Sequence, residues 1–355
     1  MIVDNLLFHN VTSMIDAKGG GKLMLRIPEE VSEHINEKAQ NMNLANCGME
    51  IRFVMPEKGA VKIRLRYDPT LSTQSVETEG KETEKELKKT YVQAIVFYGG
   101  YAVHSINIPT EEKEFIFELP EDEGMRKRFY ALCDLNKDYG YPFDTKCVRI
   151  LLKDARSVIY CGAEGNIVPP TPDMMPDKKI LMYGSSLTYG CFSFTALNSY
   201  ASITAENLGF DLINLGLAGS CWAEKELIDY IATADWNVAL LELGANMFNK
   251  FTEEQFKERV EYAVKKITSE NPDKKVFFMS PFYQHRDIIG GEKIKTYRII
   301  MENAVKGFEN AVYLDGSVMM PDSSGLSCDL VHLSEKGAKI AGKNIAEAIK
   351  KEVSR

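Results

Sequence analysis

KILMYGSSLTYG, residues 179–190, combines an apolar run with two adjacent serines that lie between glycines. The run at 179–183 is typical of a buried parallel strand, and a polar segment and then a helical pattern follow it. Open α/β sheets bind ligands at the carboxyl ends of their strands, where glycines allow the backbone to turn sharply. The stretch therefore predicts either a plain strand-to-helix turn or one edge of an active site.

Strand and helix patterns alternate from this stretch to the end of the chain. A proline-rich linker at 169–176 precedes them and marks a domain boundary. We expect strands at 179–183, 211–215, 238–243, 275–280 and 311–314, and helices near 200–208, 223–233, 252–270, 293–308 and 334–353. Gly209 is expected to be a C-cap and Ser334 an N-cap. This order indicates a five-stranded parallel sheet with helices on both faces.

The first 170 residues show a different pattern, with many short runs that alternate or are apolar. Runs at 23–27, 50–54, 61–67, 91–97, 101–108, 115–119 and 147–152 predict strands, and one helix is expected from residue 28 to about 42. Many strands with few helices are typical of a β-sandwich. We therefore predict a β-sandwich domain over 1–170 and an α/β domain over 171–355.

Three polar stretches of this first domain are interpreted as surface loops. Residues 70–89 are charged and poor in apolar side chains. The GGGK run at 19–22 lacks the upstream glycine and the following Ser or Thr of a phosphate loop, so it predicts a turn. Residues 121–123 are acidic, but they lie between a proline and a glycine without metal-ligand spacing.

Composition and charge argue against several classes of partner. The net charge is −8 without a long Lys/Arg run, which disfavours nucleic acid and anionic membranes. No apolar run approaches the length of a membrane span. The seven cysteines are scattered and the amino terminus lacks a basic n-region, so we expect a cytoplasmic protein with mostly reduced thiols. Neither a metal nor a cofactor is expected, and self-association stays open.

Polar residues follow the predicted strands at the points where the strands end. Ser186 follows the first strand, Gly219 the second and Asn246 the third, while Asp329 and His332 precede the last helix. Parallel strands bring these ends to one edge of a sheet. A serine nucleophile needs a base such as histidine, and a carboxylate orients that base. The N–H groups of Ser186 and Gly219 and the amide of Asn246 are candidate oxyanion donors.

With these residues in place, the α/β domain resembles the SGNH (GDSL-type) hydrolase family. The first family block, Gly-Asp-Ser-x-Thr-x-Gly, aligns with residues 184–190 and implies Ser186 as the nucleophile. The later glycine, Gly-x-Asn and Asp-x-x-His blocks fall on Gly219, residues 244–246 and residues 329–332. The resemblance implies a flavodoxin-like hydrolase domain with a Ser-His-Asp triad.

Ser185 stands where the family usually has its name-giving Asp. Gly-Ser-Ser variants are found in a branch that carries an N-terminal jelly-roll domain and resembles carbohydrate acetyl-esterases. The resemblance thus implies a jelly-roll-like β-sandwich and a serine esterase that removes small acyl groups, with O-acetyl on carbohydrate as the first expectation. A small-molecule or oligosaccharide ester is the expected partner.

Two other functions stay open. One is a thioesterase or lysophospholipase that acts on longer acyl chains, and the other is a non-catalytic carbohydrate-binding protein. Near the predicted triad, Ser185, Trp222 and His285 are candidate substrate contacts, because each lies in sequence beside a catalytic block or a strand end. Core packing or the start of a helix fits Trp222 equally well, and a structural or surface role is favoured for His285.

Overall fold

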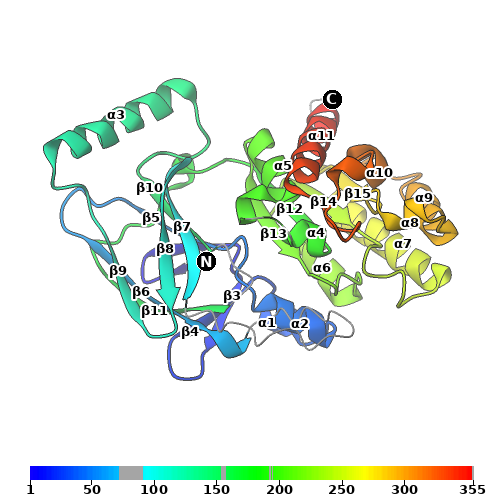
Figure 1. Cartoon of the computed structure of the whole chain (residues 1–355), viewed down its shortest axis with the longest axis horizontal. Helices are drawn as coiled ribbons and strands as arrows, with labels where there is room; N and C mark the ends of the chain where they lie inside the picture. Colours follow the sequence, from blue (N-terminus) through cyan, green and yellow to red (C-terminus); the bar gives the residue numbers. More distant parts are fainter. Residues whose placement is uncertain (72–90, 153–156, 192, 194, 354–355) are drawn as a thin grey trace. The chain divides into compact units, whose positions relative to one another are not determined.

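The computed structural model describes residues 1–71, 91–152, 157–191, 193 and 195–353, which divide into two compact units (Figure 1). The first unit is Met1–Pro28 with Asn41–Asp177, and the second is Glu29–Gln40 with Lys178–Arg355. An N-terminal segment thus belongs to the second unit, which the strand and helix pattern did not indicate. The loop predicted at 70–89 lies almost wholly outside the described residues.

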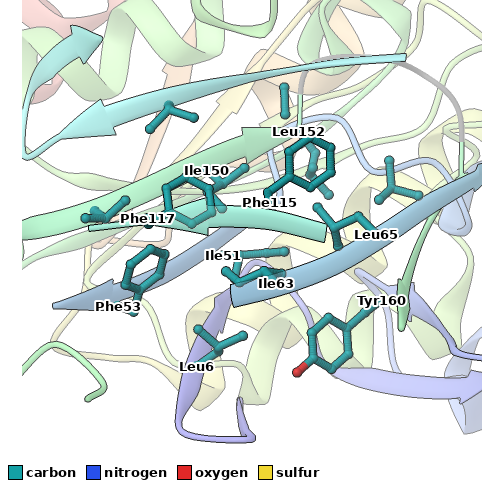
Figure 2. Packing of buried hydrophobic residues seen from close by; sticks show 14 of the residues in the cluster. Leu6, Ile51, Phe53, Ile63, Leu65, Phe115, Phe117, Ile150, Leu152 and Tyr160 are labelled. Carbon is teal, nitrogen blue, oxygen red and sulfur yellow. The ribbon is translucent and has the colours of Figure 1, made fainter. Parts of the chain in front are cut away.

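The first unit is a β-sandwich of two antiparallel sheets, as predicted, with strand orders β1-β2-β5-β10-β7-β8 and β3-β4-β11-β6-β9. Strict alternation along β6 turns every second side chain into the core, where it packs among apolar residues of both sheets (Figure 2). The strands are β1 Ile2–Val3, β2 Leu6–His9, β3 Ser13–Asp16, β4 Lys22–Leu25, β5 Glu50–Val54, β6 Val61–Asp68, β7 Tyr91–Tyr98, β8 Tyr101–Pro109, β9 Lys113–Phe117, β10 Cys147–Leu152 and β11 Ser157–Gly165.

Helix α3, Glu123–Tyr139, was not predicted; residues 121 and 122 lie in the exposed loop expected for the acidic stretch, and Glu123 begins the helix. Asp122 caps this helix by accepting a hydrogen bond from the Met125 N–H at 2.8 Å, and Gly140 ends it in the left-handed region at φ 63°. Only three of its 17 residues are buried, so no wide apolar stripe marked it in the sequence.

The single helix predicted from 28 to 42 is also corrected. The chain there forms two short helices, α1 Glu29–Ser32 and α2 Glu37–Asn43. The side chain of Asn36 caps α2 by accepting a hydrogen bond from the Ala39 N–H at 3.0 Å. Such a cap starts a new helix and interrupts the old one.

The second unit is a five-stranded parallel sheet of order β13-β12-β14-β15-β16, the flavodoxin-like order predicted for it. Helices α5 and α11 pack together on one face, and α6, α7 and α9 form a row on the other (Figure 1). The elements are β12 Lys179–Gly184, α4 Ser186–Tyr189, α5 Tyr200–Leu208, β13 Asp211–Gly216, α6 Lys225–Thr233, β14 Val238–Glu242, α7 Glu253–Glu270, β15 Val276–Met279, α8 His285–Ile288, α9 Glu292–Ala304, β16 Ala311–Leu314, α10 Gly316–Met319 and α11 Glu335–Val353.

The start of α11 is packed without spare room against the turn Ser323–Gly325. Ser334 is the predicted N-cap, and its Oγ accepts from the Gly337 N–H at 3.2 Å. The N–H and hydroxyl of Ser334 both donate to the Gly325 carbonyl, at 2.9 and 3.1 Å. A Cβ on Gly337 would lie 1.9 Å from that carbonyl oxygen. This contact fixes both ends of the loop at 326–333, which carries Asp329 and His332.

Gly337→Ala is expected to lower the free energy of unfolding of the second unit by about 1–2 kcal/mol. A Cβ only 1.9 Å from a backbone oxygen places the cost in the upper part of the about 1–3 kcal/mol that overpacking takes, and the ~1 kcal/mol of helix propensity that alanine adds offsets part of it. Both tryptophans, Trp222 and Trp236, lie in this unit, so urea unfolding followed by their fluorescence measures it. Lys339→Ala, at an exposed site on the same helix, is the control. Equal midpoints for the two variants would contradict the close packing.

Candidate active site

The nucleophile turn connects the buried strand β12 to the one-turn helix α4. Strand β12 ends at Gly184, where a Cβ would meet Thr188 Oγ1 at 2.1 Å, so only glycine fits. Ser185 caps α4, its Oγ accepting a hydrogen bond from the Leu187 N–H at 3.3 Å. Ser186 is the first residue of α4 and is half-buried. The turn therefore presents the Ser186 hydroxyl at the carboxyl edge of the sheet.

Ser186, His332 and Asp329 form a continuous line of hydrogen bonds. Ser186 Oγ lies 2.8 Å from His332 Nε2, and His332 Nδ1 lies 2.5 Å from Asp329 Oδ2. With the ring proton on Nδ1 facing the carboxylate, Nε2 is the acceptor that faces the serine hydroxyl. The structure thus brings together the three residues that the sequence analysis selected as nucleophile, base and orienting acid.

The Asp329 carboxylate is held by its own loop. Its Oδ1 accepts hydrogen bonds from Ser327 Oγ at 2.6 Å, the Val331 N–H at 2.9 Å and the His332 N–H at 3.0 Å. Partial burial raises the pKa of Asp329, but hydrogen bonds from Ser327, His332 and Val331 outweigh it and hold the pKa well below its usual range. The carboxylate therefore stays ionised opposite His332 at neutral pH.

The loop around the triad is narrow and strained at one residue. Leu326 and Leu333 form an isolated antiparallel bridge, and the Ser327 N–H donates to the His332 carbonyl at 2.8 Å. Leu330, between the two triad residues, has φ 56°, a conformation that costs a non-glycine residue energy. Its carbonyl accepts a hydrogen bond from the His285 N–H at 2.7 Å. The strain lets the chain reverse so that Asp329 reaches His332.

Three groups are the candidate oxyanion donors: the N–H of Ser186, the N–H of Gly219 and the side-chain amide of Asn246. The Ser186 N–H lies in the first turn of a helix, where amides have no intrahelical partner. Gly219 adopts φ 67°, which favours glycine and leaves its amide open to approach. Asn246 Oδ1 accepts a hydrogen bond from the Cys221 N–H at 3.2 Å, so its NH₂ group is turned away from that contact. The roles of these donors stay predictions.

The three candidate substrate contacts occupy different environments. Ser185 is only 1% exposed and its hydroxyl donates to Glu242 at 2.6 Å, so its geometry indicates support of the turn and no direct substrate contact. Trp222 packs edge-on against Phe251 with ring centroids 5.8 Å apart. Its buried Nε1 has no hydrogen-bond partner among the described residues. His285 adjoins the triad loop through its N–H bond to the Leu330 carbonyl.

Three further residues, Lys38, Asn36 and Glu242, were not identified from the sequence. Lys38, from α2, places its ammonium 2.5 Å from where a Cβ on Gly219 would be, and nothing in the local pattern predicts a contact across so many residues. Asn36 holds this segment in place by donating to the Ser220 carbonyl at 3.1 Å and to Glu224. Glu242 closes an apolar strand, and that lone charge was the signal that could have identified it.

The described residues contain neither a metal cluster nor a membrane-spanning helix. No group of three or more His, Cys, Asp or Glu side chains among them could hold a metal ion. Within the same part of the chain, every helix is too short or too polar to cross a bilayer. The residue types of the triad at the sheet edge are those that acyl transfer through serine requires.

Comparisons with known proteins bear on the family of the second unit and on the fold of the chain. The GDSL-like Lipase/Acylhydrolase family matches residues 177–340. No curated protein matches the sequence. Among solved structures, the salicylyl-acyltransferase SsfX3 from a tetracycline biosynthetic pathway has a TM-score of 0.72 at 15% identity, covering 99% of this chain and 94% of that chain.

Two carbohydrate esterases share the fold as well. A family two carbohydrate esterase from Clostridium thermocellum, in complex with cellohexaose, has a TM-score of 0.58 at 13% identity over 87% of this chain and 94% of its own. The acetyl xylan esterase Est2A from Butyrivibrio proteoclasticus has a TM-score of 0.54 at 13% identity over 100% and 97%. Residues 177–340 of the C-terminal unit thus match the GDSL-like lipase/acylhydrolase (SGNH) family, and a β-sandwich precedes them in the chain.

Proposed function

We propose that the protein is a serine esterase that removes small acyl groups, with O-acetyl groups on carbohydrate as its substrates. The observation that carries the proposal is the line of hydrogen bonds from Ser186 through His332 to Asp329. Each member has the partner that its role requires: an acceptor for the serine proton, and a carboxylate for the other ring nitrogen.

The reaction follows from this geometry. Ser186 Oγ attacks the ester carbonyl carbon while His332 Nε2 takes the hydroxyl proton. The negative charge that develops on the carbonyl oxygen faces the amides of Ser186 and Gly219 and the side chain of Asn246. His332 returns the proton to the leaving alcohol, and an acyl-serine remains. A water molecule, deprotonated by His332, then attacks the acyl-serine, and its collapse restores Ser186 and frees the acid.

The substrate class in this proposal comes from the neighbours in fold. Two of them are named as esterases of carbohydrate or xylan, and one was solved with cellohexaose. A third neighbour is named as an acyltransferase, so activity assays of this protein should also include alcohols as acyl acceptors. A thioesterase or lysophospholipase would differ from this esterase in its preference for acyl chain length, and a non-catalytic protein would bind sugar without turning over an ester. The cytoplasmic location stays a prediction.

Ser186→Ala is expected to lower kcat for 4-nitrophenyl acetate and acetylated xylo-oligosaccharides by at least about 10³-fold, because no other group replaces the nucleophile. Ser269→Ala, at an exposed serine of α7, is the control and should keep full activity. Unchanged far-ultraviolet circular dichroism would show that the variant is folded. Turnover by Ser186→Ala at the wild-type rate would refute the assignment.

Asp329→Asn is expected to lower kcat by about 10²–10⁴-fold, because the amide no longer fixes the His332 tautomer. The pKa of Asp329 lies well below its usual range, so the wild-type carboxylate is ionised from about pH 5 to 9. The loss should therefore be seen throughout that range. A pH–rate profile measures this, and a loss confined to acidic pH would contradict it.

Chain length is expected to separate the esterase functions. For a site that serves small acyl groups, kcat/KM should fall at least about tenfold from 4-nitrophenyl acetate to the octanoate, since each methylene without a place in the site is worth up to ~1–3 kcal/mol. A steep rise towards octanoate would favour a thioesterase or lysophospholipase. Cello-oligosaccharide binding without turnover of any ester would favour the non-catalytic function.

A further inference from the structure

Glu242 is a buried acidic side chain at the carboxyl end of β14, the middle strand of the parallel sheet. It ends β14, whose five residues are all buried, and its own exposure is 0%. A carboxylate removed from water is costly unless hydrogen bonds compensate for the lost hydration. The residue therefore requires a physical explanation that packing alone does not supply, and the triad mechanism makes no use of it.

The carboxylate binds the nucleophile turn on both sides of Ser186. Its Oε2 accepts hydrogen bonds from the Ser185 N–H at 2.8 Å and the Ser185 hydroxyl at 2.6 Å. The hydroxyl of Thr188 approaches the same oxygen at 3.4 Å. Ser185 Oγ in turn accepts from the Leu187 N–H and so caps α4. One oxygen of Glu242 thus fixes residues before and after the nucleophile.

Oε2 of Glu242 is surrounded by hydrogen-bond donors. An ionised group only accepts, and every contact to Oε2 is with a donor. The second oxygen, Oε1, is buried without a hydrogen-bond partner among the described residues. A proton on Oε2 would displace one of the donating hydroxyls, and a proton on Oε1 would leave Oε2 as a weaker, neutral acceptor. The hold of Oε2 on Ser185 and Thr188 is therefore firmest when Glu242 is ionised.

We propose that Glu242 is a positioning residue that aligns the Ser186 hydroxyl with His332 by holding the nucleophile turn from the neighbouring strand. Ser185 carries the contact, so this chain supplies from β14 the carboxylate that the family motif places at the position of Ser185. The proposal rests on the proposed function of Ser186 as nucleophile. The proposal implies that the role of Glu242 depends on the residue at position 185, because Ser185 carries the contact.

A dependence on pH follows from the burial of Glu242. Burial raises the pKa of Glu242 to about 7, although hydrogen bonds from Ser185 and Thr188 act to lower it. The titratable groups that feel this charge are Tyr200 on α5 and Cys221 after β13, and burial raises both of their pKa values. Both are therefore neutral near pH 7. Acidification through that range should protonate Glu242 and loosen the turn.

The test compares Glu242→Gln, Ser185→Asp and the double variant Ser185→Asp/Glu242→Gln. Glu242→Gln should lower kcat about 10- to 100-fold with little change in KM, because misplaced reacting groups cost that much without loss of binding. Its pH–rate profile should also be shallower on the acidic side. Ser185→Asp should be impaired too, because it places two carboxylates in contact. The double variant restores one carboxylate and should recover at least tenfold over Ser185→Asp.

Labelling by a fluorophosphonate separates this proposal from the proposed function. Ser186 Oγ bonds to phosphorus, fluoride leaves and His332 takes the proton, so the labelling rate reports on the nucleophile without a natural substrate. Glu226→Gln, exposed on α6, is the control and should label at the wild-type rate. If the wild type labels but hydrolyses no ester, the proposed function fails while Glu242 can still be tested by these rates.

Two results would overturn the role of Glu242. One is a folded Glu242→Gln protein with labelling and turnover within twofold of the wild type at every pH. The other is a double variant no faster than Ser185→Asp. If Glu242→Gln does not fold, recovery of folding and labelling in the double variant supports the pairing, and failure of both variants contradicts it.

Discussion

The hydrogen bond between Ser186 Oγ and His332 Nε2 joins residues 146 positions apart in the chain. Its 2.8 Å length requires the turn after the first strand of the sheet and the loop before the last helix to meet. A parallel sheet satisfies this requirement, because all of its strands end at one edge. The rest of the second unit can be understood as the structure that keeps this contact in register.

Each side of the contact is held by backbone features that only a few residue types allow. On the serine side, a side chain at Gly184 would collide with Thr188, and on the histidine side one at Gly337 would collide with the Gly325 carbonyl. The bridge between Leu326 and Leu333 closes the loop that carries the base. The strained backbone of Leu330 persists because these neighbouring contacts outweigh its cost.

The sequence predicted the α/β sheet and the triad because both depend on local signals, apolar runs and short polar blocks at their ends. It failed where the signal is not local. Helix α3 buries only Phe129, Cys133 and Asn136, so it lacks the wide apolar stripe by which a helix is predicted from its sequence. The transfer of Glu29–Gln40 to the second unit depends on tertiary contacts that no pattern within the segment encodes. Glu242 was not singled out from the sequence, because the four residues before it are apolar and the whole run was predicted as a strand.

A buried carboxylate whose hold on the turn is firmest when it is charged has a consequence for stability. The pKa of Glu242 is about 7 in the folded chain and about 4.3 in an unfolded one. Between these values the folded protein binds the extra proton, so the contribution of Glu242 to stability falls as pH rises. Alignment of Ser186 improves over the same range. At Glu242, a rise in pH thus lowers the free energy of unfolding and improves the alignment of Ser186. The alignment accounts for the retention of a destabilising charge beside the nucleophile turn.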